Sequence, residues 1–394
     1  MSRFSPRTVG AVCGSGLAAV AVAVLPFSTP AGSEQSPQPA LTALTILSGQ
    51  SLSHTYTVSG TTTTASAPLT NPDDITQLDG VIYVGFQNGV GPQGQPNGDG
   101  NADSTIVALD KSGTVLSQWD IQGKADGVTA DPAIGGVIAT VNEDANSSLY
   151  TITGGPTSSA DVQHYSYSEP LPHNGGTDAI SILGSKILIS ASAPGTTGTL
   201  AAPQPTFPAV YSVTLDAATS VASVSPYFYD EAKATTANVG AQEGKKTTLG
   251  LTDPDSNEIV PYTGPRFAGD FMLTSQGDQE QIFVNHGNPR SLSVLSLSQS
   301  VDDTAWATGP GVLYGTDSTN DAVDVLSGTF GRDPIVAVTP CGANSAPSTC
   351  PAPGFPADYM GSLNPWTGTI TTVPVSGAAF VPQGGLLFMP SRQG

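Results

Sequence analysis

The chain has 394 residues, of which 32 are acidic and 12 basic, with 45 glycines, 33 prolines and only 11% charged residues. So much Gly and Pro with so little charge excludes a coiled coil or a long helical bundle, which need charged residues at helical spacing. The net charge of −20 argues against nucleic acid as a partner, because phosphate binding depends on clustered Lys and Arg.

The N-terminal segment 1–31 has the features of a secretory signal. Arg3 and Arg7 precede an apolar run from Val9 to Phe27, and Thr29-Pro30-Ala31 offers small residues for cleavage. An uncleaved membrane anchor is the alternative, although the run is interrupted and short for a span. We therefore predict a secreted protein with no membrane span in the mature chain. A Ser-, Pro- and Gln-rich tether at 32–40 leads into one folded domain at 41–394.

The folded domain shows the strand period from end to end. Short runs of Val, Ile, Leu, Thr and Tyr are bounded by Gly, Asn, Asp and Pro, as is typical of strands and turns. Clear examples are the runs 81–85, 105–109, 137–141 and 185–190. The sequence therefore predicts an all-β fold.

Within this pattern a unit recurs, in which a polar or Gly opener leads through a strand and a Gly-bearing turn into a second strand. The opening residues of the first three units, Asp74, Asp126 and Asp178, follow one another at intervals of 52 positions. We expect 303–305 to pair with 312–314, and 377–379 to pair with 386–388. Five of the six units open at Asp74, Asp126, Asp178, Asp303 and Gly377, and the remaining unit is an irregular segment from about 249 to 294.

Units of about 50 residues repeated in this way predict a β-propeller of six four-stranded blades. A β-sandwich is the alternative, but it has no reason to repeat at this interval. Two strands at 43–47 and 54–58 belong to no unit, whereas the last unit has only two strands. We expect this N-terminal pair to complete the last blade and close the ring without an exposed edge.

The chain resembles secreted propellers of the NHL and YVTN repeat groups, and exported actinobacterial-type proteins of unassigned activity. The resemblance is carried by the openers at 126–128 and 303–305, the hairpin Leu363-Asn364-Pro365-Trp366-Thr367-Gly368 and the loop from Cys341 to Cys350. It spans about 70 to 394 and consists of structural motifs, so it implies a fold and no particular function.

The blade openers are the main candidate site, because the innermost strands of a propeller line its central channel. Asp74, Asp126, Asp178 and Asp303 would meet at one mouth, with His173 beside them. Four carboxylates in a small space repel, so a cation or a cationic or polyhydroxylated ligand would relieve them. Alternatively, each aspartate accepts hydrogen bonds from backbone N–H groups of its own loop. The oxygen-rich segment from Asp253 to Glu258 is expected to be solvated.

A second candidate is the Gly- and Asn-rich loop around Asp99, Asn101 and Asp103. Alternating oxygen ligands in a tight loop are typical of calcium sites. The loop lacks the bidentate Glu of such sites, and an ordinary turn explains it equally well. Calcium is the one cofactor that the sequence suggests.

The mature chain has two cysteines, Cys341 and Cys350, which flank a polar loop. In an exported protein this pair is expected to form a disulfide. Two thiols alone cannot hold a structural zinc ion, and no histidine lies nearby in the sequence.

Two functional classes follow from these features. A binding or surface-interaction protein needs only a shaped channel mouth for a small molecule, carbohydrate or protein, and we expect a monomer. The alternative is a metal-dependent, lactonase-like hydrolase of the six-bladed type. The ligand set of that family cannot be mapped residue by residue here, and no nucleophile motif accompanies His173.

Overall fold

The computed structural model describes residues 40–172, 176–192, 207–307, 309–340 and 358–391. All the described strands belong to one compact unit, Pro37–Gly394. The predicted signal segment 1–31, His173, Cys341 and Cys350 lie outside the described residues, as does the tether except for its last residue. In the part described, no helix has the length and apolar character needed to cross a membrane.

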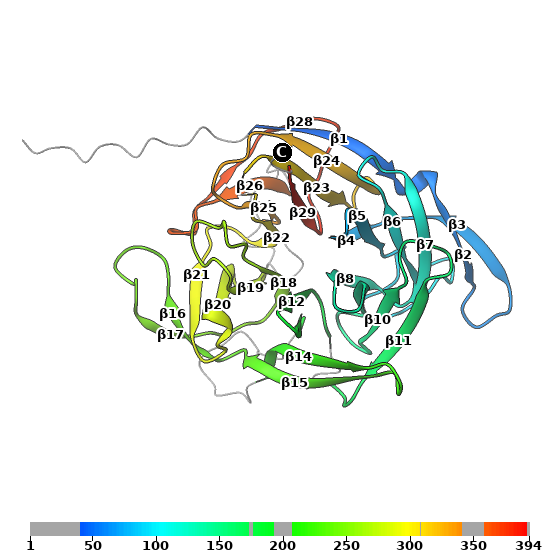
Figure 1. Cartoon of the computed structure of the whole chain (residues 1–394), viewed down its shortest axis with the longest axis horizontal. Coiled ribbons are helices and arrows are strands. Elements are labelled where there is room, and N and C mark those ends of the chain that lie inside the picture. The colour runs from blue at the N-terminus through cyan, green and yellow to red at the C-terminus, as the bar shows by residue number, and fades with distance from the viewer. Residues whose placement is uncertain (1–39, 173–175, 193–206, 308, 341–357, 392–394) are drawn as a thin grey trace, which may run out of the picture. The chain divides into compact units, whose positions relative to one another are not determined.

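The described strands form a β-propeller, as predicted, with the sheets arranged around a common centre (Figure 1). Six inner strands, one from each group, line a central cavity. Each inner strand is the first of a group of at least four hydrogen-bonded strands. The inner strands are β4 Pro72–Leu78, β8 Ala125–Asp131, β12 Ile180–Leu183, β18 Pro254–Ile259, β22 Val301–Ala305 and β29 Leu386–Pro390.

The other strands lie outward from these in order. The first three groups continue with β5 Val81–Phe86, β6 Asp103–Leu109 and β7 Val115–Gln122; β9 Gly136–Val141, β10 Ser148–Thr153 and β11 Asp161–Tyr167; and β13 Lys186–Ser190, β14 Pro208–Asp216 and β15 Val221–Tyr229. The fourth and fifth continue with β19 Phe271–Ser275, β20 Glu280–Val284, β21 Leu292–Ser296, β16 Lys233–Thr236 and β17 Lys246–Thr248; and β25 Ile335–Val338, β26 Tyr359–Leu363 and β27 Ile370–Thr372. The sixth continues with β23 Gly311–Asp317, β24 Ala322–Gly328, β1 Leu41–Ser48 and β28 Val375–Gly377.

The middle strands of each group read as continuous apolar runs because they are covered on both faces. Every residue of β9 is buried, for example. Ile106 and Ala108 of the first group pack in one cluster with Val137 and Ala139 of the second. The core is therefore a ring of apolar layers between neighbouring sheets, which leaves the first residues of the inner strands to face the cavity.

The ring is closed by an N-terminal strand, as expected, but only one strand does this. β1 pairs antiparallel with β24, from Leu41 opposite Gly328 to Ser48 opposite Ala322. The expectation that a second strand, at 54–58, also completes the last blade is wrong. This segment lies in β2 Ser53–Thr57 and the residue after it, and β2 pairs with β3 Thr64–Pro68 in a separate hairpin.

The expected pairings inside the last two units are also wrong. β22 pairs with β25, whereas the next strand in the chain, β23, pairs with β24 and β29 of the sixth group. The chain thus builds one strand of the fifth group, crosses to build two of the sixth, and returns. The run 386–388 lies in the inner strand β29, and 377–379 does not precede it in a hairpin.

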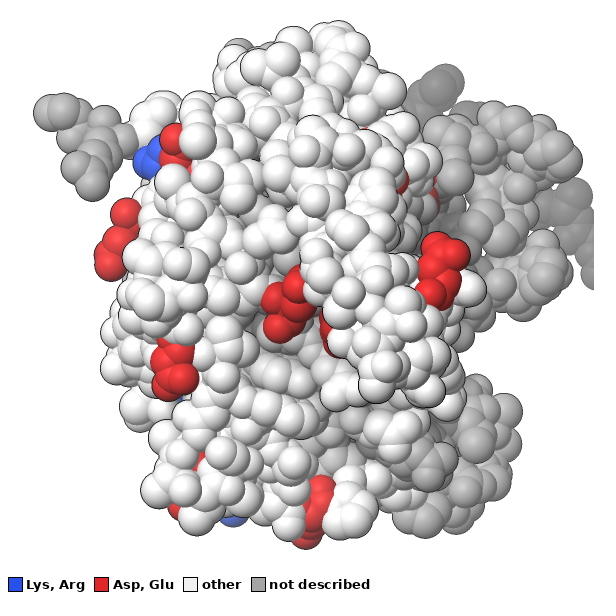
Figure 2. All heavy atoms as spheres, turned by 90° about the vertical axis from the view of Figure 1, so that its right-hand side faces the viewer, with Lys and Arg blue, Asp and Glu red and all other residues white. Residues whose placement is uncertain are grey.

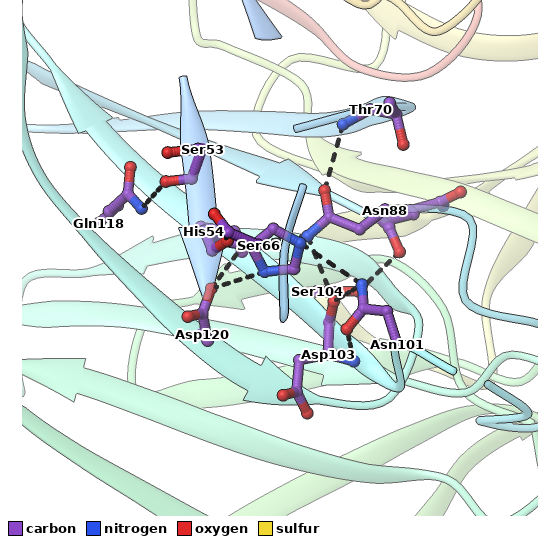
Figure 3. Close-up of polar contacts among 12 residues, drawn as sticks. Ser53, His54, Ser66, Thr70, Asn88, Asn101, Asp103, Ser104, Gln118 and Asp120 are labelled. Atoms are coloured by element: carbon purple, nitrogen blue, oxygen red, sulfur yellow. Dashed lines mark hydrogen bonds and ion pairs between the residues drawn. The ribbon is translucent and has the colours of Figure 1, made fainter. Parts of the chain in front are cut away.

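The β2–β3 hairpin is held to the first group by a buried histidine (Figure 3). The His54 side chain has no solvent exposure, and its Nδ1 lies 3.3 Å from Asp120 Oδ1 on β7. Gln118 Nε2 donates to Ser53 O at 2.9 Å. These contacts attach the N-terminal segment to an outer strand, far from the cavity.

Candidate functional site

Four of the inner strands, β4, β8, β18 and β22, open with a β-bulge, in which two residues oppose one residue of the next strand. In β4, the register against β5 shifts between Pro72 and Ile75, so Asp73 and Asp74 share the bulge. The two residues directly before β12 and β29 take the corresponding place, and Asp178 N donates to Ser190 O while Ser190 N donates to Ala179 O. We call all six the bulge pairs; in chain order they are Asp73–Asp74, Asp126–Gly127, Asp178–Ala179, Asp255–Ser256, Asp302–Asp303 and Gly384–Gly385.

This register defines a ring of five equivalent aspartates. The first bulge residue is aspartate in five strands and glycine in the sixth, and all of these residues line a cavity of about 310 Å³. We call the five the aspartate ring: Asp73, Asp126, Asp178, Asp255 and Asp302.

The four aspartates predicted from the sequence all line the cavity, but they occupy two different positions. Asp126 and Asp178 belong to the ring, whereas Asp74 and Asp303 are second bulge residues. Asp74 Oδ2 accepts a hydrogen bond from Val128 N of the next inner strand at 2.6 Å, and its Oδ1 accepts from Ile75 N. Asp303 Oδ2 likewise accepts from Leu386 N at 2.6 Å. These two carboxylates join neighbouring strands.

Glycine residues in these pairs let the inner strands approach closely. A Cβ added at Gly127 would lie 2.5 Å from Asp178 O, nearer than real Cβ atoms come. At Gly384, φ is +98°, and an added Cβ would lie 2.7 Å from Asp73 O. The sixth strand therefore contributes backbone to the ring, and Gly384 N donates to Asp302 Oδ2 at 2.6 Å.

Burial raises the pKa of every carboxyl group that lines the cavity, because the charged form loses its hydration. Backbone hydrogen bonds lower the pKa of three of these groups, but burial outweighs them. The pKa therefore rises to about 6 for Asp302, about 7 for Asp74 and about 8 for Asp303. Neighbouring carboxylates add to burial, as Asp302 and Asp178 do for the pKa of Asp73. The pKa is raised well above its ordinary value for Asp73, Asp126, Asp178, Asp255 and Glu258.

One cation stands beside the ring. Lys124 Nζ lies 3.1 Å from Asp126 Oδ1 and also bonds Glu143. Burial opposes the ammonium charge, but Asp126, Glu143 and Asp73 outweigh it and raise the pKa of Lys124. One ammonium compensates Asp126 and Glu143 only in part and leaves the rest of the ring acidic.

Several cavity oxygens have no hydrogen-bond partner in the part of the chain described. The Asp126 side chain is only 3% exposed, and its Oδ2 is unpaired. The others fall on four successive residues of β18: Asp255 Oδ2, Ser256 Oγ, Asn257 Oδ1 and Glu258 Oε1. A buried polar atom without a partner is costly, and it marks a place where a ligand can bind.

The expectation that 253–258 is a solvated loop is wrong, because β18 is an inner strand and Asp255 and Glu258 line the cavity. Sequence reasoning also missed Asp73, Asp302 and Lys124. The doublets Asp73–Asp74 and Asp302–Asp303 were the available signal, since either member could open the unit.

The Asp99–Asp103 loop is held by its own asparagines. Asn97 Oδ1 accepts from the backbone N–H groups of Asp99 and Asn101, at 2.9 and 3.0 Å. Asn101 Oδ1 accepts from Asp103 N at 2.9 Å. Among the residues described, no three His, Cys, Asp or Glu side chains are grouped to hold a metal ion. Calcium binding by this loop stays a prediction.

The two bulge positions predict opposite effects of truncation. Asp74→Ala should lower the free energy of unfolding by about 2–4 kcal/mol, because two buried N–H groups lose their acceptor. Asp178→Ala should be neutral or stabilising, since no described residue donates to that carboxylate and its removal reduces repulsion in the ring. Urea unfolding at pH 8 measures both, and equal losses would contradict the division into two positions.

No family model matches the sequence, and no curated protein matches it significantly. Solved structures with a similar arrangement include the Pseudomonas aeruginosa periplasmic gluconolactonase PpgL, at 14% identity and a TM-score of 0.40 over 89% of this chain and 99% of that one. The Dos1 propeller is 11% identical, with a TM-score of 0.36 over 68% of this chain and 76% of that one. Kuenenia stuttgartiensis hydrazine synthase is 13% identical, with a TM-score of 0.38 over 75% of this chain and 62% of that chain. The fold assignment rests on the sheets of this chain itself.

Proposed function

We propose that this chain is a ligand-binding β-propeller whose central cavity takes a small, positively charged ligand. Eight of the chain's 32 acidic residues line the cavity. On the outer face shown in Figure 2, by contrast, acidic side chains stand apart on a mostly uncharged surface. A cavity of about 310 Å³ is in the range that holds small molecules. Charge and shape thus both favour a small cation.

The observation that carries this proposal is the unpaired Oδ2 of Asp126. The other oxygen of this carboxylate is already bonded by Lys124 Nζ and by Gln87 Nε2, at 3.1 Å each. Those contacts fix the carboxylate, so Oδ2 cannot turn to solvent without breaking them. A ligand cation would supply the missing partner and reduce the repulsion among the ring carboxylates.

Thermal unfolding at pH 8 with calcium, 1,4-diaminobutane or glucose tests the proposal. At least one of the two cations should stabilise the fold, by about 2.7 kcal/mol at a hundredfold excess over its dissociation constant. Asp126→Asn should weaken that effect at least tenfold. Asp161→Asn is the matched control, because it removes one exposed carboxylate on β11. If neither cation shifts the melting temperature of the parent protein, or if only glucose does, the proposal is wrong.

A further inference from the structure

The unpaired oxygens on β18 form a row along one strand. Four successive residues, from Asp255 to Glu258, each have one buried side-chain atom without a partner in the described chain. Successive side chains of a regular strand point to opposite faces. The register of β18 against β19 shifts between Pro254 and Asn257, which interrupts this alternation at Asp255 and Ser256. All four residues line the cavity, because β18 is an inner strand whose edge faces it.

Asn257 shows what kind of group this row can bind. Its Nδ2 donates to Ala179 O at 2.7 Å and to Ser190 Oγ at 3.3 Å, so the amide orientation is set by two acceptors. Ser190 Oγ itself donates to Asp255 O at 2.8 Å, which leaves it free to accept from Asn257. The free atom is therefore Oδ1, on a residue that is 8% exposed and lines the cavity. An amide oxygen can only accept hydrogen bonds.

The row thus combines carboxyl groups with acceptors that carry no charge. Asp255 and Glu258 attract a positive charge, and Asn257 Oδ1, which lines the same cavity, needs a hydrogen-bond donor. A guanidinium or a primary ammonium group supplies both, since each carries its charge on several N–H donors. A quaternary ammonium group has the charge but no N–H, and a sugar has donors but no charge.

We propose that β18 is the seat of an N–H-bearing organic cation, an amine or guanidine, whose donors bind Asp255, Asn257 and Glu258. This inference rests on the proposed function and specifies its ligand class. Across the cavity, Asp126 Oδ2 on β8 offers a further acceptor, which suits a ligand with a second N–H group. The second end would be attracted less strongly, because Lys124 already contacts Asp126.

Calorimetric titration with two cations of equal charge and similar size tests the ligand class. Methylguanidinium has N–H donors and tetramethylammonium has none. We expect methylguanidinium to bind the parent protein at pH 8 at least tenfold more tightly than tetramethylammonium, and more tightly than calcium. If tetramethylammonium or calcium binds as tightly as methylguanidinium, or more tightly, this inference is wrong and the proposed function stands. If no cation binds, calcium and 1,4-diaminobutane included, the proposed function fails as well.

Glu258→Gln tests the place of binding. It keeps the size of the side chain but turns one acceptor into a donor, so methylguanidinium should bind at least tenfold more weakly. Ser256→Ala is a milder second variant, with an expected loss of about threefold, in case the first does not fold by circular dichroism. Asp161→Asn controls for the change in net charge. Unchanged methylguanidinium binding by folded Glu258→Gln, or by Ser256→Ala where Glu258→Gln does not fold, would overturn the assignment to β18.

Discussion

Lys124→Met is expected to lower the free energy of unfolding by about 3–5 kcal/mol at pH 8, because removing one partner of a buried ion pair leaves its charge uncompensated. Methionine keeps the length of the side chain and fills its space. The carboxylate that remains, Asp126, is 3% exposed and cannot regain its hydration. Urea unfolding measures the loss.

Two comparisons separate the charge effect from lost packing. The double variant Lys124→Met/Asp126→Asn should recover at least half of the lost stability, because the uncompensated charge is then gone. Lys111→Met, at an exposed lysine, should change stability by no more than about 0.5 kcal/mol. No recovery in the double variant would show that Lys124 acts through packing alone.

Without a ligand, we expect the protein to lose at least about 3 kcal/mol of stability between pH 5 and pH 8. Burial raises the pKa to about 6, 7 and 8 for Asp302, Asp74 and Asp303. The unfolded chain loses these protons near pH 4, whereas the folded chain keeps them until pH 6 to 8. Since the folded state binds more protons in this window, stability falls as pH rises through it.

The same carboxyl groups should make cation binding pH-dependent. At pH 8 the cavity carries more negative charge, so 1,4-diaminobutane should stabilise the fold more at pH 8 than at pH 5. Asp303→Asn keeps an oxygen acceptor for Leu386 N and should flatten the upper part of the stability profile. Asp110, whose pKa is lowered to about 2 by bonds from Ser112 and Thr114, acts below this window. If the free energy of unfolding rises from pH 5 to pH 8 without ligand, the raised pKa values of these carboxyl groups are contradicted.

The sequence was sufficient for the fold class and for the closing strand. Apolar runs such as 137–141 are buried on both faces, and this burial by neighbouring sheets leaves a pattern that can be read locally. Pairing partners leave no such pattern. The run 312–314 suits β22 and β29 equally well as an antiparallel neighbour, and only tertiary packing decides for β29.

The site was predicted in part for the same reason. Asp126 and Asp178 could be placed at the mouth, but a bulge depends on the register with another strand. No local signal therefore distinguishes Asp73 from Asp74 in its doublet. Asp255 and Glu258 were missed because β18 is polar from Asp255 to Glu258, and a polar inner strand resembles a loop in sequence.

The crossing of the chain between the fifth and sixth groups affects how the ring can assemble. β22 pairs with β25, and between these two strands the chain contributes β23 and β24 to the sixth group. That sheet in turn needs β1, in which Leu41 lies opposite Gly328. Joining segments so distant along the chain costs loop-closure entropy before any contact is gained. We therefore expect the fifth and sixth groups to form late and as one cooperative unit, so that neither could be removed, duplicated or exchanged alone.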